Sequence, residues 1–299
     1  QMGETVMGTK FQTSCGGKGA NQAVAAAKLD MAPVSMICRV GDDQFGQALL
    51  SNFREAHVQY DESSTVLADK DISTGVAPIV VDTSSGDNMI IVIPGANHAL
   101  TPTDARESIS SLLQGKYFSP PPAVVVQLEI KPETALEALK TGKEMGATTI
   151  LNTAPAPDGW TLDDFYPFID ILIPNETELA SICSGMDGDE EAMARSLLAK
   201  GVGTAVVVTL GSRGAMIVAK SGSDSTTVTL VDAPSELPCR KDPVVDTIGA
   251  GDAFCGALAT YLSSGLDLVE ASRMACGVAS MTVRKQGAQT SYPTASELP

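Results

Sequence analysis

The chain has 299 residues, of which 43% are hydrophobic and 4% aromatic, so it can form one large α/β domain or two ordinary ones around a mainly aliphatic core. Its net charge of −16 argues against nucleic acid or an anionic membrane as a partner, and it contains no apolar run long enough to span a bilayer. Six cysteines without C-x-x-C spacing and two histidines argue against a zinc site and indicate the reduced thiols of a cytoplasmic protein.

Apolar β-rich segments alternate with helical segments along most of the chain. Strands that are apolar throughout and separated by helices are typical of a mostly parallel sheet covered by helices on both faces. The pattern therefore predicts an α/β fold with Rossmann-like layering. In chain order we expect a strand at 34–40, a helix at 43–57, a strand at 123–128, a helix at 132–145, strands at 148–151 and 169–173, helices at 176–182 and 190–199, strands at 204–210, 215–219 and 226–231, and helices at 251–262 and 268–283.

One region breaks this alternation. Segments 74–81 and 88–93 have strand composition and are joined by the turn-rich sequence DTSSGD, so they predict an antiparallel hairpin. Residues 3–12 also look extended, and together these segments predict a small β lid over the crevice at the strand carboxyl ends. An edge hairpin without a lid role is the alternative. The predicted division is an α/β core of 13–72 and 96–299, with lid segments 1–12 and 73–95.

The stretch VVDTIGAGDAF, residues 244–254, places small residues and one carboxylate at the start of an apolar helix. Glycines at that position leave the first-turn N–H groups open to a ligand, and the helix dipole favours an anion there. An acid beside an anion site is suited to accept a proton from the attacking group, so Asp252 is a candidate general base beside Gly249, Ala250 and Gly251. An aspartate that only favours the helix dipole would look the same.

A second glycine-rich stretch, CGGKGANQAVAAAKL at residues 15–29, opens an alanine-rich helix. It lacks the Walker spacing. Its polar residues Lys18 and Asn21 can hydrogen-bond the hydroxyls of a polyol. A glycine-rich turn with a solvent-facing lysine is the alternative.

In IPNETELA, residues 173–180, Asn175 and Glu178 share a face of a first helical turn. An amide and a carboxylate at this spacing suit a hydrated Mg²⁺ beside phosphates. They also form the pattern of a helix N-cap and capping box, and the two interpretations are compatible.

The stretch VVVTLGSRGAMIV, residues 206–218, ends a strand at Thr209-Leu210 and turns between Gly211 and Gly214 into the next strand. This is the pattern of a β-hairpin turn. The same loop can lie along a nucleotide, with Arg213 as a candidate phosphate neighbour or as a solvated tip.

Taken together, the order and identity of these motifs resemble the ribokinase-like family of sugar and nucleoside kinases, over nearly the whole chain. The resemblance implies the α/β fold and lid described above, a homodimer formed through the lid, and ATP-dependent phosphorylation of D-ribose at O5 to ribose 5-phosphate. It also implies Mg²⁺ with the ATP and K⁺ as an activating cation. The motifs are GGKGANQA (16–23), QLE (127–129), PNETE (174–178), TLGSRG (209–214), DTIGAGDAF (246–254) and KQGAQTSYP (285–293).

Site residues follow from the resemblance motif by motif. The base and the anion hole are assigned to Asp252 and to Gly249, Ala250 and Gly251. The sugar contacts are assigned to Gly17, Lys18, Gly19, Ala20, Asn21, Glu129 and Asp252. The ATP and Mg²⁺ side is assigned to Asn175, Glu178, Thr209, Leu210, Gly211, Ser212, Arg213, Gly214, Gly251 and Cys276. The K⁺ site, made mostly of backbone carbonyls, is assigned to Asp246, Ile248, Thr282, Lys285, Gly287 and Ser291.

Two features depart from the family pattern. Sugar kinases of this family start with a strand that delivers an aspartate to the sugar, and this sequence opens at QMGETVMGTKF, which matches the segment after it. We expect that strand to precede residue 1 in the protein; its loss would make activity doubtful. Cys276 falls where relatives often place a polar residue near adenine, and a thiol there can still pack against the base.

The alternative functions are another sugar or nucleoside kinase of the family, and an inactive protein that senses a sugar or a nucleotide.

Overall fold

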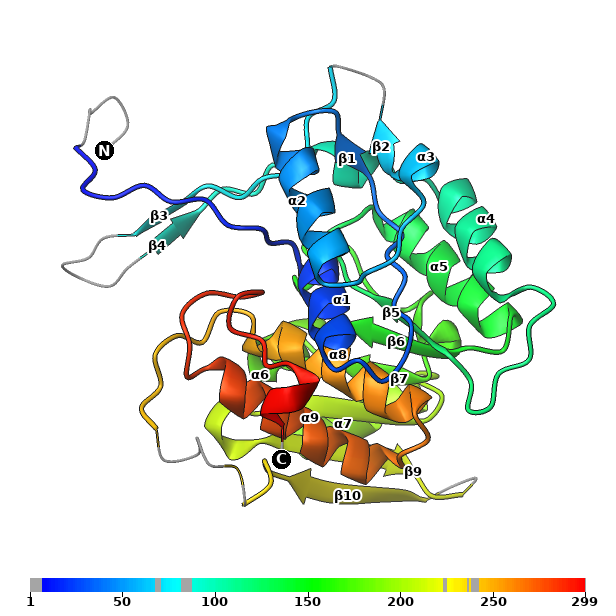
Figure 1. Cartoon of the computed structure of the whole chain (residues 1–299). Helices are drawn as coiled ribbons and strands as arrows, with labels where there is room; N and C mark the ends of the chain where they lie inside the picture. Colours follow the sequence, from blue (N-terminus) through cyan, green and yellow to red (C-terminus); the bar gives the residue numbers. More distant parts are fainter. Residues whose placement is uncertain are drawn as a thin grey trace.

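The computed structural model describes residues 7–67, 71–81, 88–222, 225–235, 237 and 242–298. Figure 1 shows an α/β body from which a hairpin projects. Within the described residues, no helix is both long enough and apolar enough to cross a membrane.

The body is built on a six-stranded sheet with the order β10-β9-β8-β7-β6-β5 (Figure 1). Strands β5 to β8 run parallel, while β8, β9 and β10 are antiparallel neighbours. Strand β7 is buried along its whole length, as expected for a strand covered on both faces. The predicted mostly parallel sheet is confirmed. The strands are Ala123–Val126 (β5), Thr148–Asn152 (β6), Ile171–Ile173 (β7), Ala205–Thr209 (β8), Ala215–Lys220 (β9) and Thr226–Val231 (β10).

Helices cover both faces of this sheet. On one face α8 and α9 pack against it, with α1 lying against α8; on the other, α5, α6 and α7 pack against the strands and α4 lies on α5 (Figure 1). Two aliphatic cores result, one on each face. The helices are Lys18–Lys28 (α1), Gln44–Glu55 (α2), Glu62–Thr65 (α3), Pro102–Leu113 (α4), Pro132–Glu144 (α5), Glu176–Ile182 (α6), Glu190–Ala199 (α7), Ala250–Ser263 (α8) and Leu268–Thr282 (α9), with short 3₁₀ turns at Gly95–Ala99 (η1), Tyr166–Phe168 (η2), Gly211–Arg213 (η3) and Ala295–Glu297 (η5).

The helices differ in how they begin. Side chains cap α2, α4, α6, α7 and α9, as Asp43 does for α2 and Thr101 for α4. In contrast, α1 and α8 begin after Gly17 and Gly249, and no described side chain caps either. The N–H of Lys18 in α1 is instead held by the side chain of Glu129, and the N–H of Ala250 in α8 donates to the carbonyl of Thr247 at 3.3 Å. Among the described residues, the N–H groups of Gly251 and Asp252 in the first turn of α8 are left for another partner.

The strand predicted at 34–40 is mostly wrong. Only Val40–Gly41 forms a strand (β1), which pairs in parallel with Val66–Leu67 (β2). The residues before it exchange backbone hydrogen bonds with Gln59, in a single bridge. The alternating side chains of Val34, Met36 and Cys38 pack against the core beside α1 and α8. These side chains are partly buried, so the apolar composition of the segment reflects packing against the core and not pairing with a neighbouring strand.

The predicted hairpin is confirmed, with shorter strands. Ile79–Val81 (β3) pairs antiparallel with Asn88–Ile90 (β4), and Val76 bridges Ile93. The joining turn at 82–87 lies outside the described residues. Of the predicted extended segment 3–12, the described part from residue 7 forms no strand with any described residue.

Candidate active site

The candidate site residues follow successive parallel strands. Glu129 comes shortly after β5, Thr153 after β6, Asn175 after β7, and Thr209 ends β8. Because the carboxyl ends of parallel strands meet at one edge, these residues lie along the edge where open α/β sheets bind ligands.

The start of α8 approaches this edge without a side-chain cap, and the N–H of Ala250 donates to the carbonyl of Thr247 at 3.3 Å. Gly249 is in the left-handed region at φ 77°, and a Cβ built there would lie 2.6 Å from the hydroxyl of Tyr292. Glycine is therefore required at position 249 by both conformation and space. A Cβ on Gly251 would meet no described atom within 4 Å, so this residue faces open space. The arrangement suits an anion at the N-terminus of a 14-residue helix.

Asp252, in the first turn of α8, contacts two amides of α1. Its Oδ2 accepts a hydrogen bond from Asn21 Nδ2 at 2.8 Å, and its Oδ1 accepts one from Gln22 Nε2 at 3.0 Å. Burial raises the pKa of Asp252, while these two hydrogen bonds and the charge of Lys18 oppose the shift. A carboxylate with a raised pKa at an open helix terminus fits the role of a proton acceptor.

The glycine-rich loop is tied to the end of β5. The backbone N–H of Lys18 donates to Oε2 of Glu129 at 2.7 Å. A Cβ on Gly19 would lie 2.9 Å from the side-chain oxygen of Gln127, so the loop packs closely on this strand end. Ala20 and Asn21 are buried in the first turn of α1. The structure thus brings Gly17, Lys18, Gly19, Ala20, Asn21, Glu129 and Asp252 into one region.

At α6 the capping box is present. Asn175 accepts from the N–H of Glu178 at 2.8 Å, and Glu178 accepts from the N–H of Asn175 at 3.0 Å. Thr153 donates a third hydrogen bond to Glu178, at 3.0 Å. Burial raises the pKa of Cys255 in α8, and the negative charges of Asp252 and then Glu178 add to this shift.

The loop from Thr209 to Gly214 forms the predicted tight turn between β8 and β9. Thr209 bridges Asn175, which places this loop beside the start of α6. Leu210 is buried below the turn, and the remaining predicted nucleotide residues, Gly211, Ser212 and Gly214, lie in it. Arg213 forms ion pairs with Glu176 at 2.5 Å and Glu190 at 3.3 Å, and these compete with the predicted phosphate contact.

Cys276 lies in α9 and is 7% exposed. Burial raises its pKa to about 12, so the thiol is neutral at physiological pH and behaves as a small apolar side chain. A buried, neutral thiol is compatible with the expected packing against a base.

The predicted cation residues come from two loops that Asp246 joins. One of its oxygens accepts from the N–H of Ile248 at 3.0 Å, and the other accepts from the N–H of Gly287 at 2.9 Å. Thr282 and Ser291 are fully buried at the ends of the second loop, and Lys285 is paired with Glu297. Carboxylate, hydroxyl and carbonyl oxygens are the donors a hard cation takes, so the donor set fits. The described residues contain no group of three or more His, Cys, Asp or Glu that could hold a metal.

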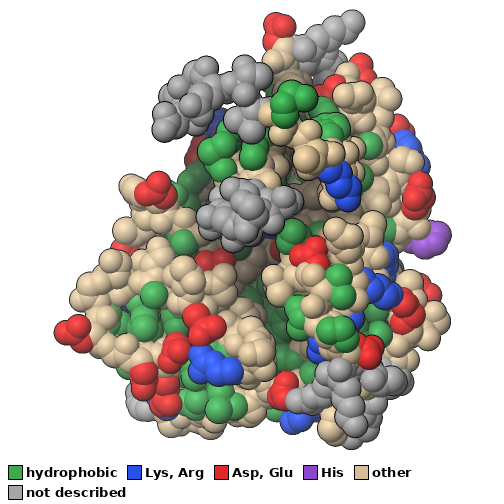
Figure 2. Space-filling model, turned by 90° about the vertical axis from the view of Figure 1, so that its left-hand side faces the viewer, with side chains coloured by type: hydrophobic (Ala, Val, Ile, Leu, Met, Phe, Trp, Pro, Cys, Tyr) green, Lys and Arg blue, Asp and Glu red, His purple; other side chains and the backbone are tan. Residues whose placement is uncertain are grey.

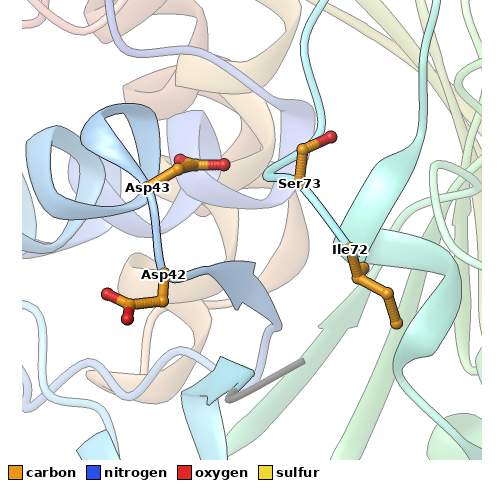
Figure 3. A pocket seen from close by; sticks show the side chains of 4 residues that line it. All are labelled: Asp42, Asp43, Ile72 and Ser73. Atoms are coloured by element: carbon orange, nitrogen blue, oxygen red, sulfur yellow. The ribbon is translucent and has the colours of Figure 1, made fainter. Parts of the chain in front are cut away.

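A cavity of about 320 Å³ lies where the hairpin leaves the body, lined by Asp42, Asp43, Ile72 and Ser73 (Figure 3). Asp43 caps α2 through one oxygen and accepts the N–H of Thr74 at 2.7 Å through the other. This carboxylate thus fastens the base of the hairpin to α2.

Several functional candidates were not found from the sequence. Gln22, Gln127, Asn152 and Gln289 are hydrogen-bonded around Asn21 and Asp252. The one available signal was a polar pair, Asn21-Gln22, inside an otherwise apolar, alanine-rich helix.

The model of the pfkB family carbohydrate kinases matches residues 2–295. The chain belongs to this family. It is 35% identical over 303 residues to a ribokinase of Mus musculus, covering 99% of this chain and 87% of that protein. It is 37% identical over 297 residues to a deoxyribokinase of Salmonella typhi, covering 98% and 89%. A ribokinase of Arabidopsis thaliana, solved with ribose and ATP, superimposes with a TM-score of 0.80 at 27% identity, covering 100% and 90%.

Membership of the pfkB family makes the chain a phosphotransferase that acts on an alcohol group of a carbohydrate. The two curated relatives are about equally similar to it but differ in the sugar they are named for. The identity of the sugar is therefore a separate question from the reaction class.

Proposed function

We propose that this pfkB-family kinase transfers the γ-phosphoryl group of ATP to O5 of D-ribose, giving ribose 5-phosphate. One observation carries the proposal: Asp252 is oriented by two α1 amides at the uncapped start of α8, in the same region as Lys18 and Glu129. A proton acceptor, an anion site and hydrogen-bonding groups for hydroxyls are the parts that phosphoryl transfer to a sugar needs.

In the proposed mechanism the chain positions the reactants and stabilises charge. Polar groups of the glycine-rich loop and Glu129 hold the sugar hydroxyls. Asp252 takes the proton of the attacking hydroxyl as the oxygen–phosphorus bond forms. The N–H of Gly251, together with that of Ala250 once it leaves the carbonyl of Thr247, stabilises the negative charge of the transferring group. The loop from Thr209 to Gly214 holds the nucleotide.

Two ions complete the proposal. Asn175 and Glu178 would hold a hydrated Mg²⁺ through its waters, since their oxygens keep lone pairs beyond those used in the capping box. Mg²⁺ supplies neutralisation of the phosphate charges. The two loops joined by Asp246 would hold K⁺ through Ile248, Thr282, Lys285, Gly287 and Ser291.

The first experiment is a sugar comparison with coupled detection of ADP release. We expect kcat/KM for D-ribose to exceed that for 2-deoxy-D-ribose by at least about tenfold, because a site that hydrogen-bonds a hydroxyl discriminates strongly against its absence. The reverse order would favour a deoxyribokinase, the second candidate, which the 37% identity to the Salmonella enzyme supports. If neither sugar stimulates ADP release, the result contradicts the ribokinase proposal and favours a different substrate or a sensor.

We also propose a homodimer formed through the hairpin. Its strands expose Ile79, Val80, Val81, Met89 and Ile90, each more than half exposed. Figure 2 views the molecule from the hairpin side and shows hydrophobic side chains gathered near the top of this face. A cluster of this kind marks an interaction surface, because isolated apolar residues are normal but contiguous ones are not.

The dimer is tested by placing charges on both faces of β3. Neighbouring strand residues point to opposite faces, so the double variant Ile79→Asp/Val80→Asp is expected to elute as a monomer in light-scattering chromatography, while the unmodified protein is a dimer. Leu230, 70% exposed in β10, provides the control, since Leu230→Asp is expected to remain dimeric. An unmodified protein that is monomeric, or a double variant that stays dimeric, contradicts the proposal.

A further inference from the structure

Six amide side chains form two hydrogen-bonded chains that end on Asp252. Four of the six, Asn21, Gln22, Asn152 and Gln289, are exposed by 9% or less. Buried amides are costly unless they are hydrogen-bonded, so their concentration around one carboxylate requires an explanation. The other two are Asn52 in α2 and Gln127 after β5.

The first chain has a fixed direction. Asn152 Nδ2 donates to the backbone carbonyl of Ile173 at 2.9 Å, and a carbonyl can only accept. Asn152 Oδ1 is therefore turned towards Gln22, whose Nε2 donates to it at 3.1 Å. Gln127 Nε2 donates to Gln22 Oε1 at 2.6 Å, so the oxygen of Gln22 is also committed. The remaining N–H of Gln22 must then point at Asp252 Oδ1, where it lies at 3.0 Å.

The second chain reaches the other oxygen of the same carboxylate. Asn52 Nδ2 donates to Gln289 Oε1, and Gln289 Nε2 donates to Asn21 Oδ1 at 2.8 Å. Asn21 Nδ2 then donates to Asp252 Oδ2 at 2.8 Å. Each oxygen of Asp252 therefore receives one N–H from an amide whose own oxygen is held by another residue.

Two inward-pointing N–H groups favour the ionised carboxylate, which only accepts, over the neutral acid. The two N–H groups also fix the orientation of the carboxylate plane in the first turn of α8. Lys18 on α1 favours the ionised form as well, whereas burial opposes it. Cys255 on α8 and Tyr292 beside Gly249 have raised pKa values, so both are neutral neighbours.

We propose that Gln22, clamped between Gln127 and Asn152, is a positioning residue that orients Asp252 and keeps it ready to accept a proton. The proposal rests on the proposed role of Asp252 as the base, and it extends the site to residues that act through Asp252.

The test replaces Gln22 by methionine, which matches its length and cannot donate. A hydrogen bond to a charged group contributes enough that its loss is expected to move the acid limb of the kcat/KM–pH profile upward by about one unit. Turnover below that limb then falls about tenfold and recovers as the pH is raised. Gln127→Leu removes the hydrogen bond to Gln22 Oε1 and leaves the contacts of Asp252 in place. It is expected to shift the acid limb of the kcat/KM–pH profile upward as well, but by less than Gln22→Met. Gln114→Met, at an exposed glutamine after α4, is the matched control and keeps the original limb.

A second readout separates this proposal from the proposed function. Carboxyl ¹³C titration of Asp252 by NMR, in the protein without substrate, is expected to show a higher pKa in Gln22→Met than in the unmodified protein. If both the titration and the acid limb are unchanged, while stability or turnover falls equally at all pH values, Gln22 is only structural and the proposal is overturned. If the unmodified protein phosphorylates no sugar, the proposed function fails, and the titration alone still decides the role of Gln22.

Discussion

Replacing Asp252 by asparagine is expected to lower kcat for phosphoryl transfer by about 10²–10⁴-fold, the usual contribution of a positioned general base. The side chain keeps its size but loses the ability to accept the hydroxyl proton. Ribose and ATP are expected to bind with little change, because the glycine-rich loop, Glu129 and the helix N-terminus are unaltered. Steady-state turnover and calorimetric titration with each substrate measure the two effects separately.

The amide that Asp252→Asn introduces would place an N–H group against Asn21 or Gln22, both of which already donate to this position. Asp252→Ala therefore serves as the companion variant, because it removes the base without this donor–donor contact.

Both variants are expected to lose the acid limb of the kcat/KM–pH profile that the unmodified protein shows. Since burial raises the pKa of Asp252, that limb is expected above the ordinary aspartate value of about 3.9, with activity rising as pH increases and the carboxyl loses its proton. If both variants turn over as fast as the unmodified protein, Asp252 is not the general base.

The parts of the fold that could be predicted are those that depend on local pattern. β7 and β8 are apolar along both faces, and the helix expected at 251–262 is found at Ala250–Ser263. The strand expected at 34–40 shows the limit, because its apolar composition reflects packing against the core but does not determine which backbone the segment pairs with. A strand needs a neighbour, and a neighbour distant in sequence leaves no trace in the segment itself.

In the candidate site too, features made of consecutive residues could be predicted, whereas contacts between distant residues could not. Glycines at 249 and 251 and the acid at 252 could be interpreted locally, since a helix mouth is made of consecutive residues. The orientation of Asp252 could not, because it depends on Gln22, 230 positions away, and through Asn21 on Gln289, 268 positions from Asn21. Glutamine is common on protein surfaces, so its type alone does not indicate burial beside a carboxylate. Only the folded backbone brings these amides together.

Gly249→Ala and Gly251→Ala add one methyl group each to the start of α8, and we expect only the first to lower stability. At position 249 the methyl must adopt φ 77° and would lie 2.6 Å from the Tyr292 hydroxyl and 3.0 Å from the Cα of Ala288. Left-handed strain of about 1–2 kcal/mol and overpacking of about 1–3 kcal/mol combine to lower the free energy of unfolding by about 2–5 kcal/mol. Denaturant unfolding of both variants measures this difference.

At position 251 the methyl meets no described atom within 4 Å, and alanine is a better helix residue than glycine. The free energy of unfolding is therefore expected to stay the same or rise slightly. Activity is expected to fall at least about tenfold. The methyl points into the space beside the N–H groups, where the transferring phosphoryl group is proposed to lie, and the loss of one donor to a transition-state oxyanion costs about 10²-fold or more in rate.

A Gly251→Ala protein that is both stable and fully active would place the phosphoryl group away from the start of α8. A Gly249→Ala protein as stable as the unmodified chain would show that Tyr292 and Ala288 move aside, and the glycine would then be explained by ligand access alone.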